Sequence, residues 1–361
     1  MEFIKLAPRH EGVVHDITFD YYGNVIDYYY YYYLKIIIMF IMFIKGKRVS
    51  TCGADREIKV WDLDGNGKWT SEKIRAHTNS IWRLSWSHPE FGQLIASCSE
   101  DTTVCVWEEQ ESITTGNRVN ADRWLKKVTL TESKKAVNDV KFSPRHLGLR
   151  LATASADGSI RIYEATDIFS LSYWQLVDTI QVEDTTGLMS EMGVAETSIL
   201  RQSEHGLTCL SWNDCPFEPA KIAVGGFSRF AAVWTCDQKT GKWKEECILG
   251  DHVGVVHDIA WAPVMGRSFH QIATASRDNI VKVFTLTRKG DGSLECKGNP
   301  AILTCKSPVW RVAWNATGTI LATSGDDGAL SLWRKNFDGH WVSVQDIKPI
   351  NENLRNNYKS N

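Results

Sequence analysis

The sequence has almost no excess of charge of either sign. Its 361 residues contain 41 Lys and Arg and 43 Asp and Glu, which gives a formal net charge of −2. Proteins that bind nucleic acid or anionic membranes through broad electrostatic attraction carry a clear basic excess. The composition therefore predicts no direct contact with nucleic acid.

The motifs of catalytic and metal sites are also missing. There is no phosphate-binding glycine loop, no zinc-ligand spacing and no nucleophile elbow. Asp326 and Asp327 are adjacent carboxylates, but they precede Gly328 in a turn sequence, which explains them without catalysis. We therefore expect no catalytic residue, no metal and no cofactor, and we do not expect an enzyme.

The nine cysteines include no Cys-x-x-Cys pair, and no secretory signal peptide opens the chain. These absences predict reduced thiols in the cytosol or nucleus. Cys98 and Cys105 fall in one predicted hairpin. We interpret them as small buried core residues rather than as a disulfide.

Long apolar runs are absent except in residues 25–47. This segment holds six consecutive tyrosines and then an 11-residue, mostly apolar run at 34–44 that includes Lys35. A membrane-spanning helix needs about 20 apolar residues, so no membrane span is predicted.

Residues 25–47 also interrupt a regular spacing. Elsewhere the last aromatic residue of a predicted first strand precedes a turn aspartate by 13 to 17 residues, but Phe19 precedes Asp55 by 36. Removing these 23 residues restores a spacing of 13. We interpret the segment as an anomalous insert. A retained intron explains it, because valine codons begin with GT, lysine can be AAG, and 23 codons keep the frame.

What the sequence does have is a repeated hairpin. In five copies a turn aspartate lies six residues before a closing aromatic residue, and a looser sixth copy runs from Ser228 to Trp234. The five pairs are Asp55 and Trp61, Asp101 and Trp107, Asp157 and Tyr163, Asp278 and Phe284, and Asp327 and Trp333. Such repeats predict an all-β fold built from six similar units.

The units resemble WD repeats, each of which forms one four-stranded blade of a β-propeller. Their landmarks are degenerate, although His77 and the pair Trp61-Asp62 are kept. We expect one propeller domain over residues 1–348, with residues 184–204 as a long loop between blades. Residues 349–361 are expected to be a disordered tail. A partner-binding role for the 184–204 loop is an alternative to a plain surface loop.

The resemblance can be narrowed to the SEH-type nucleoporins, the nuclear-pore relatives of the propeller in the COPII coat cage. The segments that carry it are residues 80–92, 141–149, 266–270 and 309–315. Residues 155–165 favour the nucleoporin over the coat protein. The alternative function is therefore that of the COPII cage propeller in ER-to-Golgi vesicle transport.

The resemblance implies an open six-bladed propeller that is completed by a seventh blade from an α-helical scaffold nucleoporin. It implies a structural subunit of the Y-shaped outer-ring complex, together with other outer-ring nucleoporins, in mRNA and protein transport at the nuclear envelope. It also implies a second assembly, the coat-like complex that regulates TOR signalling at the vacuolar or lysosomal membrane surface.

Residues 3–6 are predicted to form a strand that is left over once six blades are counted. Because an unpaired strand leaves its backbone groups without partners, it either closes the ring on the last blade or joins a blade from another chain. We therefore predict partner contacts at Phe3, Ile4 and Leu6. His15 and Asp16, near the propeller face, are also predicted to contact a partner.

Other polar residues have a structural interpretation. His77 with Asp101, and His252 with Asp278, are expected to form hydrogen-bond networks inside their blades. Arg83 and Arg311 each follow a tryptophan. We expect them to pack against neighbouring blades or to make contacts at the rim.

Overall fold

The computed structural model describes most of the chain. The described residues are 3–4, 10–20, 39–40, 48–110, 123–167, 170–182, 206–250, 252–290 and 292–347. The predicted 184–204 loop and the predicted 349–361 tail lie outside them. So does the 25–47 insert, apart from Met39–Phe40.

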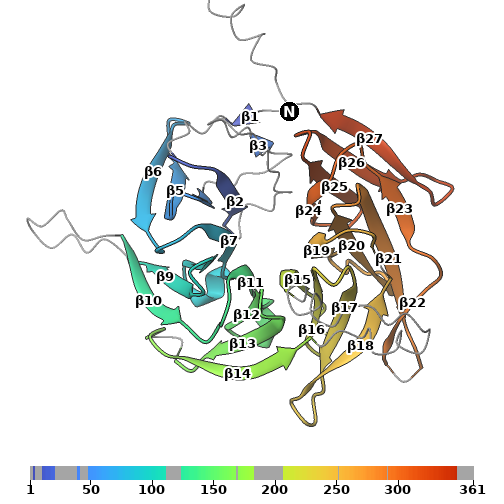
Figure 1. The fold of residues 1–361 in the computed structure, drawn as a ribbon, viewed down its shortest axis with the longest axis horizontal. Coiled ribbons are helices and arrows are strands. Elements are labelled where there is room, and N and C mark those ends of the chain that lie inside the picture. Colours follow the sequence, from blue (N-terminus) through green and yellow to red (C-terminus); the bar gives the residue numbers. More distant parts are fainter. Residues whose placement is uncertain are drawn as a thin grey trace, which may run out of the picture.

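Six antiparallel sheets stand around a common axis (Figure 1), so the predicted six-bladed all-β propeller is confirmed. Helical structure in the described residues is limited to two 3₁₀ turns, η1 (Pro89–Phe91) and η2 (Arg145–Leu147).

The first three blades each have four strands, which follow one another from the axis outward. Blade 1 contains β2 (Val14–Phe19), β4 (Arg48–Gly53), β5 (Glu57–Leu63) and β6 (Trp69–Arg75). Blade 2 contains β7 (Ile81–Trp86), β8 (Leu94–Ser99), β9 (Val104–Glu109) and β10 (Trp124–Leu130). Blade 3 contains β11 (Val137–Phe142), β12 (Arg150–Ser155), β13 (Ser159–Ala165) and β14 (Trp174–Gln181).

The last three blades follow the same order, with an extra outer strand in blade 5. Blade 4 contains β15 (Leu207–Trp212), β16 (Lys221–Gly226), β17 (Ala231–Cys236) and β18 (Trp243–Leu249). Blade 5 contains β19 (Val256–Trp261), β20 (Phe269–Ser276) and β21 (Ile280–Arg288), and both β22 (Leu294–Cys296) and β23 (Ala301–Thr304) pair with β21. Blade 6 contains β24 (Val309–Trp314), β25 (Ile320–Gly325), β26 (Leu330–Lys335) and β27 (Trp341–Ile347).

The repeated turn aspartate shapes the hairpin between the second and third strands of five blades. Its carboxylate accepts a hydrogen bond from the backbone N–H two residues later. The N–H of Thr103 donates to Asp101 over 3.1 Å, and that of Ile280 donates to Asp278 over 3.0 Å. The residue just after the aspartate, or after Ser228 in blade 4, has a positive φ. These residues are Arg56, Thr102, Gly158, Arg229, Asn279 and Gly328. The side-chain hydrogen bond thus stabilises a backbone conformation that non-glycine residues seldom adopt.

Apolar side chains of neighbouring blades pack together in five clusters, one at each junction from blades 1 and 2 to blades 5 and 6. The second strand of a blade is covered on both faces, and every residue of β8 and β16 is buried. Cys98 and Cys105 are free, buried core residues as predicted. They do not face one another, because Cys105 pairs with Ser97 across the hairpin.

The leftover strand is short and has a partner in its own chain. β1 (Phe3–Ile4) pairs with β3 (Met39–Phe40), which belongs to the predicted insert. Figure 1 draws this pair at the opening between blade 1 and blade 6. Two pairings were predicted for this strand, with the last blade or with a blade from another chain. In the structure Phe3 and Ile4 make neither, because the insert supplies their strand partner. Leu6 lies outside the described residues.

Candidate partner interface

The inner strands join the blades in pairs. In blades 1, 3 and 5 the third residue of the inner strand is an aspartate whose carboxylate accepts a backbone N–H from the next blade. The backbone N–H of Leu84 donates to Asp16 (2.7 Å), that of Leu210 to Asp139 (2.9 Å) and that of Val312 to Asp258 (3.0 Å).

A tryptophan of the second blade in each pair donates back to the first. The indole N–H groups donate from Trp86 to the Thr18 carbonyl (3.3 Å), from Trp212 to the Lys141 carbonyl (3.3 Å) and from Trp314 to the Ala260 carbonyl (3.1 Å). Buried hydrogen bonds of this kind fix geometry because an unmade one costs the desolvation of the polar group. The six blades therefore form three two-blade units.

A serine joins one unit to the next. The backbone N–H of Phe142 donates to Ser85 Oγ (3.1 Å), and that of Trp261 donates to Ser211 Oγ (3.0 Å). Both serines are the fifth residue of their inner strand. The corresponding residue of blade 6 is Ala313, which has no hydroxyl. The sequence thus omits this acceptor at the place where blade 6 would have to join blade 1.

We call the facing sides of blade 6 (β24–β27) and blade 1 (β2, β4, β5 and β6) the open junction. Within the described residues, the inner strands of neighbouring blades lie against one another at the five other junctions, whereas β24 and β2 make little contact. The two blades meet at the axis, where Arg311 Nη2 donates to the His15 carbonyl over 3.3 Å. The predicted gap between the first and last blades is therefore a feature of the described ring.

Apolar side chains line the blade 6 side of the open junction. Ala322, Leu330 and Leu332 are buried there, and Ala313, Ile320 and Ile347 pack against them. All six belong to blade 6, whereas each of the five other junctions has a cluster drawn from two blades. In the described part of the chain, this apolar face is not matched by side chains of blade 1.

The blade 1 side carries the residues that pack on a preceding blade elsewhere in the ring. Leu84, Ile95 and Trp107 of blade 2 belong to the cluster shared with blade 1. The residues at the same repeat positions of blade 1 are Ile17, Val49 and Trp61, all buried. Because one repeat pattern produces both sets, blade 1 presents a face suited to another blade.

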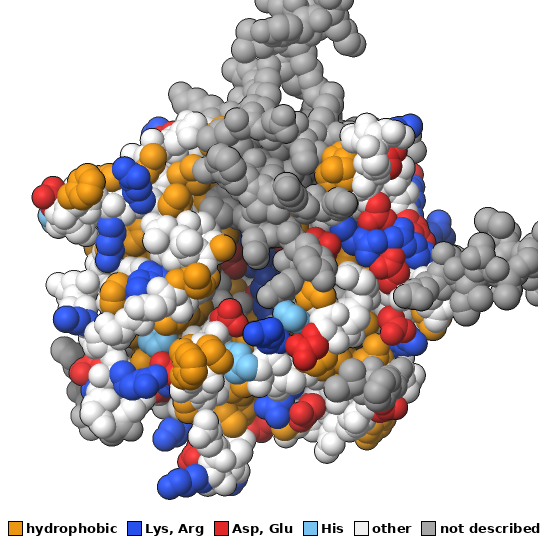
Figure 2. Space-filling model, turned by 180° about the vertical axis from the view of Figure 1, so that it is seen from behind, with side chains coloured by type: hydrophobic (Ala, Val, Ile, Leu, Met, Phe, Trp, Pro, Cys, Tyr) orange, Lys and Arg blue, Asp and Glu red, His pale blue; other side chains and the backbone are white. Residues whose placement is uncertain are grey.

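Charged side chains lie around the axis of the ring. The third residues of five inner strands are charged, and these are Asp16, Arg83, Asp139, Asp258 and Arg311. Arg83 reaches across the ring, where its Nη2 lies 2.7 Å from Asp258 Oδ1 and its Nε lies 3.9 Å from Asp139 Oδ1. Seen from behind, acidic, basic and histidine side chains border the hollow at the middle of the molecule (Figure 2).

Burial and ion pairing act in opposite directions on these groups. Burial raises the pKa of Asp16, even though the charges of Arg83 and Arg311 oppose the rise. Burial would also raise the pKa of Asp258, but the charges of Arg83 and Arg311 outweigh it and lower that pKa. Arg83 is only 5% exposed, so the expectation of a rim contact is wrong for this residue. It serves as a buried ion-pair partner for two blades.

The residues that were predicted to contact a partner do not share one environment in the structure. Asp16 is buried and bonded to blade 2, which gives it a role inside the ring. His15 packs against Trp82 with ring centroids 4.5 Å apart and ring planes tilted by 44°. Burial and the charge of Arg311 lower the pKa of His15 to about 4, so its imidazole is neutral at pH 7. Phe3 and Ile4 lie in β1, whose side chains are outside the described set.

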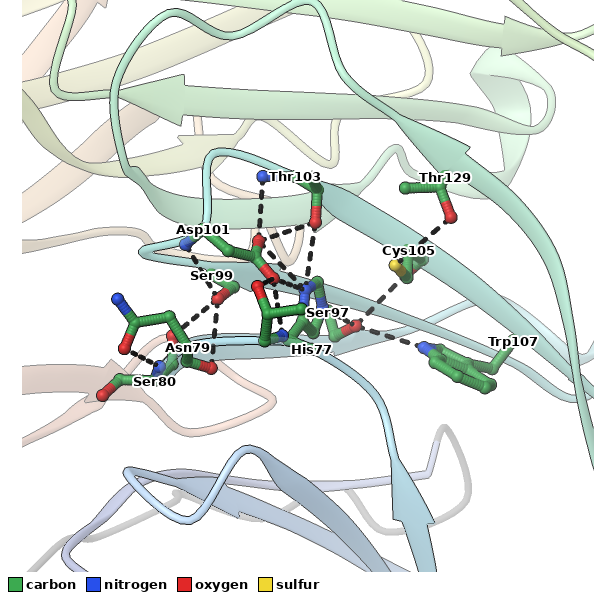
Figure 3. A network of polar contacts seen from close by, with 11 residues as sticks. His77, Asn79, Ser80, Ser97, Ser99, Asp101, Thr103, Cys105, Trp107 and Thr129 are labelled. Carbon is green, nitrogen blue, oxygen red and sulfur yellow. Dashed lines mark hydrogen bonds and ion pairs between the residues drawn. The ribbon is translucent and has the colours of Figure 1, made fainter.

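The predicted histidine networks are confirmed, and Figure 3 shows the one in blade 2. His77 Nδ1 lies 3.1 Å from Asp101 Oδ2, its Nε2 lies 2.8 Å from Ser97 Oγ, and the Trp107 indole donates to Ser97 Oγ over 3.2 Å. In blade 5, His252 Nδ1 lies 3.0 Å from Asp278.

A third network in blade 1 was not predicted. His10 Nδ1 lies 2.6 Å from Asp55 and its Nε2 lies 2.8 Å from Thr51 Oγ1, which also accepts from the Trp61 indole (3.0 Å). Blade 2 has the same four groups, an aspartate, a histidine, a hydroxyl and an indole, in the same contacts. This repeated set is the sequence signal that could have identified the blade 1 network. Its hydroxyl and indole lie on the blade 1 face that borders the open junction.

The His77 network predicts a specific pH dependence of stability. Burial disfavours the charged imidazole, but its hydrogen bonds with Asp101 and Cys105 outweigh burial and raise the pKa of His77 to about 9. Its contribution is therefore complete below about pH 6.5, the pKa of an unfolded histidine, and is lost as the pH rises through about 9. The pKa of Asp101 is lowered, so its own contribution is lost as the pH falls below about 4.

The variant His77→Ala is expected to lose about 1–3 kcal/mol at pH 6, because it removes buried hydrogen bonds, and less at pH 9.5. Urea unfolding followed by tryptophan fluorescence at both pH values measures the difference. His146→Ala, at an exposed turn, is the matched control and should match the parent at both. An equal loss at pH 6 and pH 9.5 would contradict the assignment of charge to His77.

In the described residues, no group of three or more His, Cys, Asp or Glu side chains is placed to hold a metal ion. Among these residues there is also no helix of the length and apolar character that a membrane crossing requires.

Comparison with known proteins agrees with the architecture. The family described as "WD domain, G-beta repeat" matches residues 69–108, 124–164 and 299–334. Nucleoporin SEH1 of Danio rerio is 35% identical over 366 residues, which cover 96% of this chain and 88% of the relative. Nucleoporin SEH1-A of Xenopus laevis is 34% identical, with coverage of 98% and 91%.

Nucleoporin SEH1 of Homo sapiens is 35% identical over 371 residues, which cover 96% of this chain and 89% of the relative. Identity at this level extends over nearly the whole of each chain, and the six blades and WD repeats agree with a propeller of this kind. The chain belongs to the SEH1 family of nucleoporins.

Proposed function

We propose that this nucleoporin is a non-enzymatic scaffold subunit of the Y-shaped outer-ring complex of the nuclear pore. An α-helical scaffold nucleoporin supplies a seventh blade to its open junction. In this role it supports mRNA and protein transport by building the pore. The same junction serves the second assembly, the coat-like complex that regulates TOR signalling at the vacuolar or lysosomal surface.

The observation that supports this proposal best is the unmatched apolar face of blade 6. Ala322, Leu330 and Leu332 are buried in a cluster that draws on blade 6 alone in the described residues. Strand addition from another chain is a common way to cover such an edge, because main-chain hydrogen bonds give affinity and alternate side chains give specificity. Ala313 adds to the argument, since it removes the hydroxyl that joins the other two-blade units.

Affinity purification of the tagged full-length chain, followed by mass spectrometry, tests the assembly. We expect outer-ring nucleoporins, including an α-helical scaffold protein in equal amount. Co-expression of the two chains and hydrogen exchange then locates the contact. Protection is expected on β24 to β27 and on β2, and not on β14. Recovery of COPII cage proteins instead, or protection away from the open junction, would overturn the proposal.

A further inference from the structure

The blade repeat places a basic group beside the turn aspartate. In blades 1, 2 and 5 this group is a histidine four residues before the inner strand. Its Nδ1 lies 2.6 Å, 3.1 Å and 3.0 Å from the aspartate of the respective blade. Its Nε2 lies 2.8 Å, 2.8 Å and 2.7 Å from a hydroxyl of the second strand. The pairs are His10 and Asp55, His77 and Asp101, and His252 and Asp278.

Blade 3 keeps this arrangement with a different basic group. The residue at the histidine position is Ser133, and the cation is Arg161, four residues after the turn aspartate. Arg161 Nη2 lies 2.8 Å from Asp157 Oδ2, and its Nη1 donates to Ser133 Oγ over 3.1 Å. Both Arg161 and Ser133 are buried. In this blade a guanidinium therefore compensates for a small residue at the histidine position.

Blade 6 has small residues at both positions. Cys305 stands four residues before β24, and Ser331 stands four residues after Asp327. The hydroxyl and the indole of the network are kept, because Trp333 Nε1 donates to Thr323 Oγ1 over 3.1 Å. A cavity of about 70 Å³ lies among these side chains. Its lining includes Cys305, Thr323, Asp327, Ser331, Trp333 and Asp346.

The cavity is large enough for more than water, and its walls are rich in acceptors. One water molecule needs about 10–15 Å³ of such space, so a group of several non-hydrogen atoms fits. The carboxylates of Asp327 and Asp346 and the buried hydroxyl of Thr323 border it. Lys306 also borders it, but this side chain is 74% exposed and its Nζ lies 3.3 Å from Asp346. Planar cations with several N–H groups match acceptors arranged in this way.

We propose that this cavity binds a planar cationic group, a guanidinium or an imidazolium, from outside the chain. Its N–H groups donate to the Asp327 carboxylate and the Thr323 hydroxyl, as His77 and His252 contact the corresponding groups of their blades. Either a free small cation or an arginine or histidine side chain of a peptide presents this chemistry. Cys305 and Trp333 pack against the cluster between blades 5 and 6, so the site is separate from the open junction and independent of the proposed function.

NMR titration of the ¹⁵N-labelled full-length chain tests the proposal. The probes are methylguanidinium and, at about pH 6 where it is mostly protonated, imidazole. The indole N–H of Trp333 is the reporter, and the variant Trp333→Phe identifies its signal. Both probes are expected to shift this signal saturably at millimolar concentration and to leave the signal of Trp107 in blade 2 unchanged. Tetramethylammonium carries the charge without an N–H group and should cause no shift.

Three variants locate the bound cation. Cys305→His supplies the ring from within the chain, so it should abolish the shift and raise the thermal midpoint. Cys215→His changes another half-buried cysteine, in the turn after β15, and should bind both probes as the parent does. Asp327→Asn keeps an acceptor for the Ala329 N–H, which Asp327 binds at 3.0 Å. Because it removes the charge, it should weaken binding about tenfold.

A peptide with one arginine, compared with the same peptide containing citrulline, distinguishes the two sources. Binding of the arginine peptide about tenfold tighter than methylguanidinium indicates a side chain of a peptide partner, and equal binding indicates a free cation. Absence of a Trp333 shift with both probes, an equal shift with tetramethylammonium, or a shift that persists in Cys305→His would overturn the proposal. The titrations of the parent protein decide the matter even if a variant does not fold.

Discussion

Replacing Arg83 with alanine is expected to lower the free energy of unfolding by about 3–5 kcal/mol, enough to leave the ring largely unfolded under mild conditions. Arg83 is buried at the axis and pairs with Asp258 at 2.7 Å. Its removal leaves that carboxylate, together with Asp139 and Asp16, in a low-dielectric environment where an unpaired charge is costly. Urea unfolding followed by tryptophan fluorescence at pH 7 measures the loss.

The pH dependence of this variant follows from the sign of the Asp258 shift. In the parent protein the lowered pKa of Asp258 contributes stability that is present above about pH 4 and is lost at lower pH. Without Arg83, burial is opposed only by the charge of Arg311 and the Val312 N–H, so the pKa of Asp258 rises and its charged carboxylate loses much of its stabilising contribution. The difference between parent and variant should therefore be largest near pH 7 and shrink as the pH approaches 4.

Arg150→Ala is the matched control for Arg83→Ala. Arg150 pairs with Glu164 at 3.3 Å, but both side chains are about one-third exposed, and such pairs contribute about 0–1 kcal/mol. A loss below about 1 kcal/mol for Arg83→Ala, or a loss that does not depend on pH, would show that the axial ion pair is not what stabilises the ring.

The blades themselves could be predicted from the sequence because each depends on local physics. An aspartate six residues before an aromatic marks a hairpin whose carboxylate binds the backbone two residues on, as Asp101 and Asp278 show. The His77 and His252 networks could be predicted for the same reason, since all their members recur at fixed offsets within one repeat.

The features that depend on contacts between distant repeats could not be predicted. His10 was missed because it lies 45 residues before Asp55, beyond the insert that breaks the spacing. Arg83 was expected at a rim or against a neighbouring blade, yet its partner Asp258 is 175 residues away on the far side of the ring. The alternation of aspartate and serine acceptors along the inner strands is visible in the sequence only once the ring shows which N–H groups they face.

The same alternation explains why the open junction sits between blades 6 and 1. Each two-blade unit is completed by an aspartate and a tryptophan, and units are joined by Ser85 and Ser211. Ala313 ends the series, so blade 6 has an apolar face without the serine acceptor that holds the next inner strand elsewhere. A blade from another chain has to bring its own main-chain hydrogen bonds and apolar side chains to this face.

The variant Leu332→Glu is expected to weaken binding of the blade-donating partner by about 100-fold or more. Leu332 belongs to the apolar cluster on blade 6 that includes Leu330 and Ala322. Leu332 is only 3% exposed in the chain alone, so the loss comes from the glutamate, whose charge has to be desolvated against the partner without a cation. Since 1.4 kcal/mol corresponds to a tenfold change in affinity, a penalty of about 3 kcal/mol gives two orders of magnitude. Isothermal titration calorimetry with the purified partner measures the loss of affinity.

Two further variants separate a lost interface from a lost fold. Leu176→Glu lies on β14, where Leu176 is 36% exposed, and should bind the partner as the parent does. Leu321→Glu puts the same charge into the cluster between blades 5 and 6, where Leu321 is 0% exposed, and should lower the thermal midpoint sharply. Because Leu332 is itself only 3% exposed, Leu332→Glu should also lower the thermal midpoint, by less than Leu321→Glu does, and should in addition lose binding. If it binds with parental affinity, the blade 6 face is not where the partner inserts. If it melts like Leu321→Glu, that face is already covered by the chain itself and needs no second molecule.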